Sequence, residues 1–236
     1  MLGWRGRIGY VSPSTVQLPW EFQDLLPEGV SVVITNLGVR AHQEAEFARA
    51  QEHIEAAIEL LVGEGAQVVI LAGVPLAVRL GYQGEQEAHR AWSARAGVPV
   101  TSGLAAAVAA LRHLGAQRPV VATAYLPEFN QQIARYLSDA GLAVAGVGGL
   151  SVRSPAEASR VAPTAYYQLA RELVAAHPEA DAVFLGTRGN VHTTALLLER
   201  DLGLPVVHGL QAGLWWALRY LRVAPPQGWG RLLSGS

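Results

Sequence analysis

The chain has 236 residues, of which half are hydrophobic and 16% are charged, with a formal net charge of −1 at pH 7 and no cysteine. This composition is typical of a globular protein and argues against disorder, and the length suits one large α/β domain or two smaller lobes. The net charge gives no electrostatic reason to expect binding to nucleic acid or to an acidic membrane. No apolar run reaches the roughly 18 residues of a membrane-spanning helix. The lack of cysteine excludes disulfides and metal sites with thiolate ligands.

The first half of the chain alternates short β-branched runs with amphipathic helical stretches, an order typical of a parallel α/β sheet. Its continuous apolar run at 68–71 is expected of a central strand that is buried on both faces. The pattern predicts strands at 7–11, 30–36, 68–71 and 98–100, and helices at 44–61, 85–96 and 104–114.

The second half repeats this order. The segments 97–106 and 203–212 share six of ten positions, including glycines and a proline at strand and turn positions. We therefore predict an α/β fold of two similar Rossmann-like parallel-sheet halves, residues 1–115 and 116–236, related by a pseudo-twofold axis. The expected strands are 119–124, 142–147, 182–185 and 205–207, the helices are 127–140, 163–176, 191–202 and 211–221, and a surface tail covers 225–236.

The loops at the strand ends are the candidate functional site. Ligands of parallel sheets bind beyond the carboxyl ends of the strands, and two related halves would bring two such ends around one cleft. Small residues, hydroxyls and backbone N–H groups collect there, and such turns can hold a carboxylate or an enolate. We expect a small carboxylate as the ligand and no metal, because no His/Asp/Glu group has ligand spacing. The loops are 12–15, 73–75, 101–103, 123–125, 186–190 and 208–209.

Several segments match motifs of a known family. The order and spacing of these segments resemble those of the arylmalonate decarboxylase and maleate isomerase branch of the aspartate/glutamate racemase superfamily. The resemblance runs nearly from end to end of the chain. The resemblance implies a lyase or isomerase that needs neither metal nor organic cofactor, acts beside a carboxylate through a carbanion or enolate, and moves protons with cysteine. The matching segments are Ala122-Thr123-Ala124-Tyr125 followed by Asn130, 202–207 followed by 212–215, the strand ends at Gly73 and Thr187, and 228–232.

The first half carries two loops that match the family. The resemblance implies that Pro13 and Ser14 lie against the substrate, and a plain β-turn is the structural alternative. Gly73 occupies the first cysteine position, as it does in the decarboxylases of this branch. The next two positions carry hydroxyl residues in those enzymes, whereas here Val74 offers only its N–H and Pro75 offers no donor.

The second half carries the other candidate binding residues. The resemblance implies that Tyr125 binds the substrate carboxylate, with a strand-capping role as the alternative. Arg188 replaces a glycine of the decarboxylases and could clamp a carboxylate, and a surface ion pair is its alternative. Gly189 offers a backbone N–H, and Asn190 resembles an asparagine of the isomerases.

The acid/base group of the site must be a residue other than cysteine. Thr187 occupies the second cysteine position, and an alcohol has a pKa far above the value of about 8.5 for a thiol, so it needs a base to act. His208 is the best-placed base, at a strand end facing the predicted cleft, and the repeat puts Ser102 opposite it. His192 lies in the helix after Thr187. A hydrogen-bonded structural role is the alternative for either histidine.

Three functional hypotheses follow from a site that resembles that of the family but lacks its cysteines. The first is a cofactor-free decarboxylase or isomerase of small mono- or dicarboxylates that works without the family cysteines. The second is a non-catalytic carboxylate binder, and the third is a hydrolase or lyase in which Thr187 pairs with a histidine. A cytoplasmic location is the default expectation, because residues 1–5 lead almost directly into a strand and leave no room for a signal peptide. A homo-oligomer is compatible with the sequence.

Overall fold

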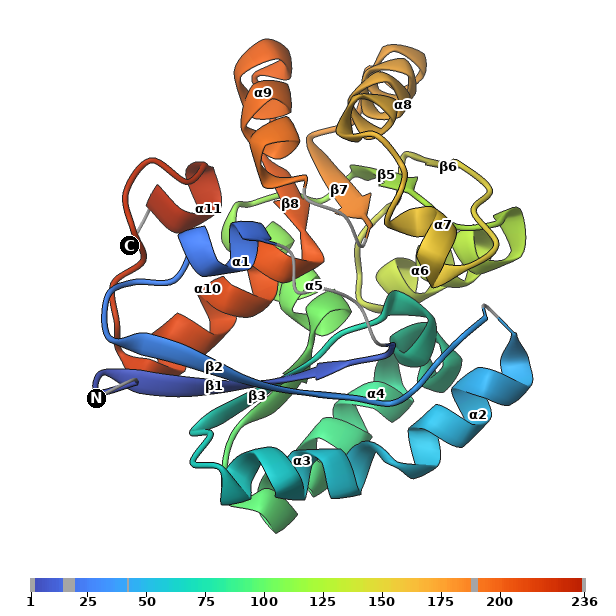
Figure 1. The fold of residues 1–236 in the computed structure, drawn as a ribbon. Helices are drawn as coiled ribbons and strands as arrows, with labels where there is room; N and C mark the ends of the chain where they lie inside the picture. Colours follow the sequence, from blue (N-terminus) through green and yellow to red (C-terminus); the bar gives the residue numbers. More distant parts are fainter. Residues whose placement is uncertain (1–2, 15–19, 42, 188–190, 235–236) are drawn as a thin grey trace.

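Two parallel four-stranded sheets organise the chain, one in each half (Figure 1). The computed structural model describes residues 3–14, 20–41, 43–187 and 191–234. The strand order is β2-β1-β3-β4 in the first sheet and β6-β5-β7-β8 in the second, and all pairs are parallel. The strands are β1 (Gly6–Ser12), β2 (Val30–Asn36), β3 (Val68–Leu71), β4 (Val100–Ser102), β5 (Pro119–Thr123), β6 (Gly146–Gly149), β7 (Ala182–Gly186) and β8 (Val206–His208).

The helices follow the strands in the alternating order of a parallel α/β protein. None of the helices within the described residues is long and apolar enough to cross a bilayer. The first half has α1 (Trp20–Asp24), α2 (Glu44–Glu52), α3 (Ile54–Gly63), α4 (Val74–Ala96) and α5 (Gly103–His113). The second half has α6 (Pro127–Asp139), α7 (Pro155–Ala158), α8 (Pro163–Ala176), α9 (His192–Leu202), α10 (Gly209–Leu221) and α11 (Arg231–Ser234).

The predicted fold class is confirmed, because the two sheets have the same strand order and the same connections. Helices α5 and α10, which follow the corresponding strands β4 and β8, pack against each other near the middle of the molecule in Figure 1. Gly103 and Gly209 are equivalent positions of the repeat, and a Cβ atom on Gly103 would lie 3.3 Å from the carbonyl oxygen of Gly209. Small residues are therefore needed at this crossing.

One hydrophobic cluster contains residues of both halves, including Ile8 and Leu104 from the first and Ile133 and Leu214 from the second. These four side chains are almost completely buried. Removing such apolar surface from water is the main force that holds the halves together. The division into domains 1–115 and 116–236 stays a prediction.

The predicted helix at 85–96 starts too late. In the structure α4 begins at Val74, directly after the first turn, and Gly81 interrupts it with a positive φ of 67°. Pro75 is tolerated at the second helical position because the first turn does not use its N–H in a helical hydrogen bond. The loop expected at 73–75 is therefore only the single residue Gly73 followed by a helix N-terminus.

Three further expectations differ from the structure. The helix expected at 44–61 is divided into α2 and α3 at His53. The predicted surface tail at 225–236 contains α11, whose Leu232 and Leu233 side chains are buried in the shared core. The strand expected at 142–147 is displaced to β6, and α1 was not expected at all.

Candidate active site

The carboxyl ends of the two sheets face each other, as three contacts between the halves show. Gly103 and Gly209 follow β4 and β8 and meet directly. The rings of Phe47 and Phe129 lie 5.9 Å apart, edge to face. The carboxylate of Glu21 on α1 accepts the backbone N–H of His192 on α9 at 2.9 Å. The described residues of the loops predicted to form the site therefore lie on facing sides of the interface between the halves.

The first turn brings Gly73 and Pro13 together. Gly73 lies between β3 and α4 with φ 103° and ψ 93°, a conformation that residues with a side chain rarely adopt. A Cβ atom on Gly73 would lie 3.0 Å from the Cγ atom and 3.2 Å from the Cβ atom of Pro13. Any side chain at position 73 therefore requires Pro13 to move.

The helix N-terminus after Gly73 has few donors for an anion. Pro75 has no N–H, and the N–H of Leu76 is donated to the carbonyl oxygen of Gly73 at 3.0 Å. Of the first three helical residues, Val74 is the one whose N–H can be offered to a ligand. The side chains at these positions supply no hydroxyl, so any carboxylate here must be held partly by other elements.

Ser14 supplies a hydroxyl close to this turn. Its side chain is buried, and its Oγ atom has no hydrogen-bond partner among the described residues. Its carbonyl oxygen accepts the Ser12 hydroxyl at 2.8 Å, and the Pro13 carbonyl accepts the N–H of Val39 at 2.8 Å, so the backbone of the loop is held in place. A buried unpaired hydroxyl costs about 1–3 kcal/mol, which a ligand oxygen at this position would offset.

Tyr125 is held by a local network after β5. Its N–H is donated to the Thr123 hydroxyl oxygen at 3.0 Å, its carbonyl accepts the Asn130 side-chain amide at 3.4 Å, and Thr123 and Asn130 are joined at 2.5 Å. Gly149 packs against this network so closely that a Cβ atom there would lie 2.4 Å from the Tyr125 carbonyl oxygen. The Tyr125 ring lies 6.3 Å from the Phe129 ring, and the Phe129 ring in turn contacts Phe47 of the first half. Substrate binding by Tyr125 stays a prediction.

The second turn ends β7 at Thr187, which is half-buried. Its side chain interacts with the hydroxyl of Tyr166, a fully buried residue of α8. Burial raises the pKa of Tyr166, and the nearby Thr187 side chain opposes this only in part, while the Tyr166 hydroxyl has no partner in hydrogen-bond geometry among the described residues. Arg188, Gly189 and Asn190 lie outside the described residues, so their predicted roles in binding stay predictions.

Two buried histidines meet at the carboxyl end of β8. The Nδ1 atom of His192 lies 3.1 Å from the Nε2 atom of His208, and the His192 ring packs on Trp229 at 5.0 Å. Burial lowers the pKa of His192 to about 4. Burial, and then the neighbouring His192, lower the pKa of His208 well below its ordinary value. At neutral pH both rings are therefore neutral, and one donates an N–H to the other.

Glu21 holds the N-terminus of α9 and was not identified from the sequence. Its carboxylate accepts the N–H groups of His192 at 2.9 Å and Thr193 at 3.4 Å. Burial raises the pKa of Glu21, although backbone hydrogen bonds from His192, Thr193 and Val191 oppose the shift. An anion here matches the positive end of the helix dipole. The N–H groups at the N-terminus of α9 are thus already bound by a carboxylate of the protein itself.

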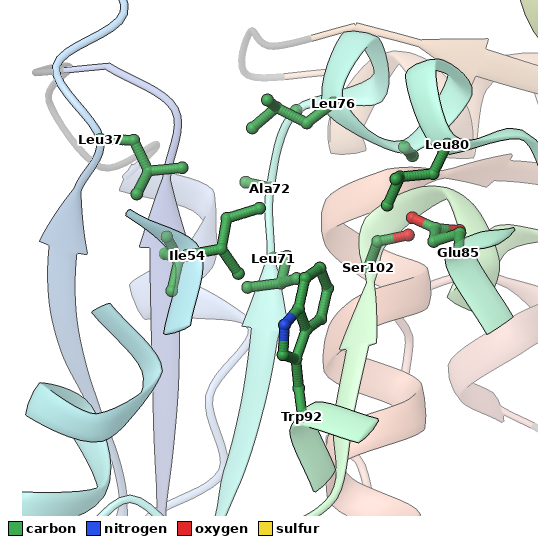
Figure 2. A pocket seen from close by; sticks show the side chains of 12 residues that line it. Leu37, Ile54, Leu71, Ala72, Leu76, Leu80, Glu85, Trp92 and Ser102 are labelled. Atoms are coloured by element: carbon green, nitrogen blue, oxygen red, sulfur yellow. The ribbon is translucent and has the colours of Figure 1, made fainter. Parts of the chain in front are cut away.

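Glu85 is a second titratable residue that sequence reasoning missed. It lines a small cavity that Gly73 also borders (Figure 2). The available signal was the spacing of Glu85 and His89, which places them on the same face of α4. The structure groups no three His, Asp or Glu side chains in metal-binding geometry within the residues that it describes.

The comparisons with known proteins agree with this architecture. A family model described as arylmalonate decarboxylase matches residues 8–233. The chain is 28% identical over 230 residues to an arylmalonate decarboxylase of Bordetella bronchiseptica, covering 96% of this chain and 95% of that protein. It is 30% identical over 243 residues to a maleate isomerase of Nocardia farcinica, with the same coverage of 96% and 95%.

Solved structures show the same relationship. A liganded double mutant of arylmalonate decarboxylase superposes with a TM-score of 0.91 at 26% identity, covering 98% of this chain and 100% of the other. Unliganded arylmalonate decarboxylase has a TM-score of 0.86 at 28% identity, with the same coverage. With matches across almost the whole chain, this protein belongs to the arylmalonate decarboxylase family and is an enzyme of the lyase or isomerase type.

Proposed function

We propose that this protein converts a small mono- or dicarboxylate through a carbanion or enolate, as a decarboxylase or isomerase, without metal, organic cofactor or thiol. The observation that carries the proposal is the buried neutral pair of His192 and His208, which lies on the same half as Thr187. This pair offers acid/base groups in a protein that has no cysteine. Imidazole is the side chain best suited to proton transfer near neutral pH.

The substrate carboxylate would be held between the two turns. On the first side the donors are the Val74 N–H and the Ser14 hydroxyl, whose Oγ atom has no partner among the described residues. On the second side we assign Tyr125, with Arg188, Gly189 and Asn190 as further predicted contacts. Such donors stabilise the charge that develops on the carboxylate oxygens when a neighbouring carbon becomes a carbanion.

The chemical step would use the histidines and not the threonine. In a decarboxylation, the carbon–carbon bond to carbon dioxide breaks, and its electron pair stays on the substrate as an enolate. A proton taken up from solvent is shared by His208 and His192 as one imidazolium, and this imidazolium donates it to the carbon, which returns both rings to the neutral form. Thr187, whose hydroxyl interacts with Tyr166, orients the turn and is not a strong acid.

The test is turnover of a panel of malonates, maleate and amino acids by the wild-type protein and three variants. We expect His208→Asn to lower kcat about 100-fold, the typical contribution of one acid/base group, and Tyr125→Phe to raise KM. His53→Asn, at an exposed histidine between α2 and α3, is the matched control and should behave as wild type. Equal activity of His208→Asn and wild type would refute the role of the imidazole pair.

A second experiment asks whether the remaining site still fits the family reaction. Thr187→Cys places a thiol at the second cysteine position without the conflict with Pro13 that a cysteine at Gly73 would meet. A gain of decarboxylase activity is the expected result. Stabilisation by malonate or maleate in thermal unfolding, without turnover by wild type or Thr187→Cys, would instead indicate a carboxylate binder.

A further inference from the structure

The cavity bordered by Gly73 lies inside the first half, between the carboxyl ends of β3 and β4 and helix α4 (Figure 2). Its walls are mainly apolar, with Leu71, Leu76 and Trp92 among them. Glu85 and Ser102 form its polar side, and their side chains point toward each other in Figure 2. The volume of about 10 Å³ is close to that needed for one water molecule.

Glu85 is fixed by partners from both halves. Its side chain is only 2% exposed, it accepts a hydrogen bond from the hydroxyl of Tyr136 on α6, and the hydroxyl of Ser102 lies beside it. Ser102 in turn accepts the N–H of Ala105 at 3.0 Å and caps α5. The Nε2 atom of His89 lies 3.7 Å from the Glu85 carboxyl, beyond hydrogen-bond distance. The carboxyl group thus has hydroxyl partners at close range.

The surroundings of Glu85 favour a proton on the carboxyl group at mildly acidic to neutral pH. Burial raises the pKa of Glu85 to about 7, against the opposing hydrogen bonds of Tyr136 and Ser102. Burial lowers the pKa of His89 to about 4, so this neighbour carries no charge at neutral pH. Burial, and then Glu85 itself, raise the pKa of Tyr136. The other titratable or charged groups nearby are Tyr82 on α4, whose ring packs edge to face on Tyr136, and Arg112 on α5, which contacts Tyr82.

The repeat gives this arrangement a counterpart in the second half. Ser102 and His208 are equivalent positions, and each precedes the first residue of a central helix, α5 or α10. His208 contacts His192, which lies on α9, the helix after the Thr187 turn. Ser102 contacts Glu85, which lies on α4, the helix after the Gly73 turn. Each cysteine position of the family is therefore followed by a helix that carries a buried titratable side chain.

We propose that Glu85 is a proton-holding residue of the active site, which supplies protons to the Gly73 side of a bound carbanion through one water molecule in this cavity. The proposal rests on the proposed function and concerns a reaction with proton transfer on both faces of the substrate, in which the imidazole pair takes a proton on one face and Glu85 supplies one on the other. Water donates a proton to the substrate carbon, where the new C–H bond forms, and it takes the Glu85 carboxyl proton, whose O–H electron pair stays on the carboxylate. A proton from solvent then restores the neutral acid. Because Glu85 acts through water, it is a positioning and proton-holding residue and does not touch the substrate.

The test compares wild type with Glu85→Gln, which preserves shape and an acceptor for Tyr136 and Ser102 but cannot release a proton. Glu87→Gln, at an exposed position of the same helix, is the matched control. Difference infrared spectroscopy between about pH 5 and pH 9, without substrate, should show a protonated carboxyl signal that disappears with a midpoint at about 7. This signal should be absent from Glu85→Gln and present in Glu87→Gln.

The same proteins are then assayed on a substrate that the wild type turns over. We expect wild-type kcat to fall as pH rises through about 7, because Glu85 loses its proton in that range. Glu85→Gln should lower kcat about 100-fold, leave KM nearly unchanged and remove this pH dependence, and Glu85→Asp should restore part of it. Glu87→Gln should match wild type.

Two results would overturn the proposal while leaving the proposed function intact: no titrating carboxyl signal that depends on Glu85, or unchanged kcat and pH dependence in Glu85→Gln. A wild-type protein that turns over nothing in the panel would overturn both. The infrared result separates these cases, because it reports the protonation of Glu85 without any reaction.

Discussion

Gly73 is predicted to stand at the first cysteine position of the family, and its backbone and its neighbour Pro13 both disfavour a side chain there. The φ of 103° lies in a region that glycine populates at little cost and other residues rarely adopt. The ring of Pro13 occupies the space that a Cβ atom would need. The absence of cysteine on this side is therefore consistent with the local geometry as well as with the sequence.

Gly73→Ala is expected to lower the free energy of unfolding by about 2–3 kcal/mol, since backbone strain and the contact with Pro13 add. Urea denaturation measures the change. Gly97→Ala is the matched control, because Gly97 also has a positive φ of 70° but no atom within 4 Å of the added Cβ. It should cost about 1 kcal/mol. Equal losses in the two variants would show that Pro13 contributes nothing.

The N-terminus of α9 shows how one element is positioned by another. This helix begins at His192, and its first N–H groups are held by the Glu21 carboxylate from α1. Figure 1 shows α1 on the same side of the molecule as β8 and α9. Since α9 also carries His192, the contact of Glu21 positions one member of the imidazole pair.

Glu21→Ala is expected to destabilise the protein by about 2 kcal/mol, through loss of hydrogen bonds to a charged, buried cap. Glu21→Gln, which keeps an acceptor but loses the charge, should cost less. Chemical denaturation of both variants beside Glu28→Ala, an exposed glutamate in the same segment, checks the order. If Glu21→Ala were as stable as Glu28→Ala, the cap would have no energetic role.

The buried titratable groups of the molecule have pKa shifts with opposite effects on the pH dependence of stability. Burial lowers the pKa of His89 and His192 to about 4 and that of His208 well below its ordinary value. Between pH 6.5 and about 4, these rings bind protons in the unfolded chain but not in the folded one, so stability is lost as pH falls. Glu85, with a pKa raised to about 7 from 4.5, binds its proton more tightly when folded, so its contribution is lost as pH rises through 7.

We therefore expect the net stability to fall between pH 6.5 and about 4, because three histidines outweigh the two glutamates with a raised pKa, Glu21 and Glu85, in this window. Thermal unfolding as a function of pH measures this. His208→Asn should flatten the acid side of the profile, whereas His53→Asn, at an exposed histidine, should leave the profile unchanged. A wild-type profile that rises toward pH 4 would contradict the neutral state of the buried imidazoles.

Much of the fold could be predicted because its signals are local. The run 68–71 became β3, buried throughout, and the repeat of 97–106 in 203–212 became equivalent strand–helix joints around Gly103 and Gly209. The start of α4 was missed because Val74-Pro75 resembles a loop, although proline suits a first helical turn. The tail was misjudged because two leucines do not reveal from sequence which surface will cover them.

The candidate site was only partly predictable. The turns at Gly73 and Thr187 were identifiable from their place after buried strands. Glu21 was not, because its hydrogen-bond partner His192 lies 171 residues away. Glu85 was not, because a glutamate on an amphipathic helix normally faces water, and only the packing of α6 against α4 encloses it with Tyr136.

The alternation of strands and helices, the internal repeat and the lack of any thiol could all be established from the amino-acid sequence, since hydrophobic periodicity and composition are properties of the chain itself. The folded arrangement was needed to show that His192 meets His208, that Glu21 caps α9 and that Glu85 lies beside the cavity at Gly73. These meetings depend on how two distant halves pack, and the protonation of each group depends on burial and neighbours that the linear order does not specify.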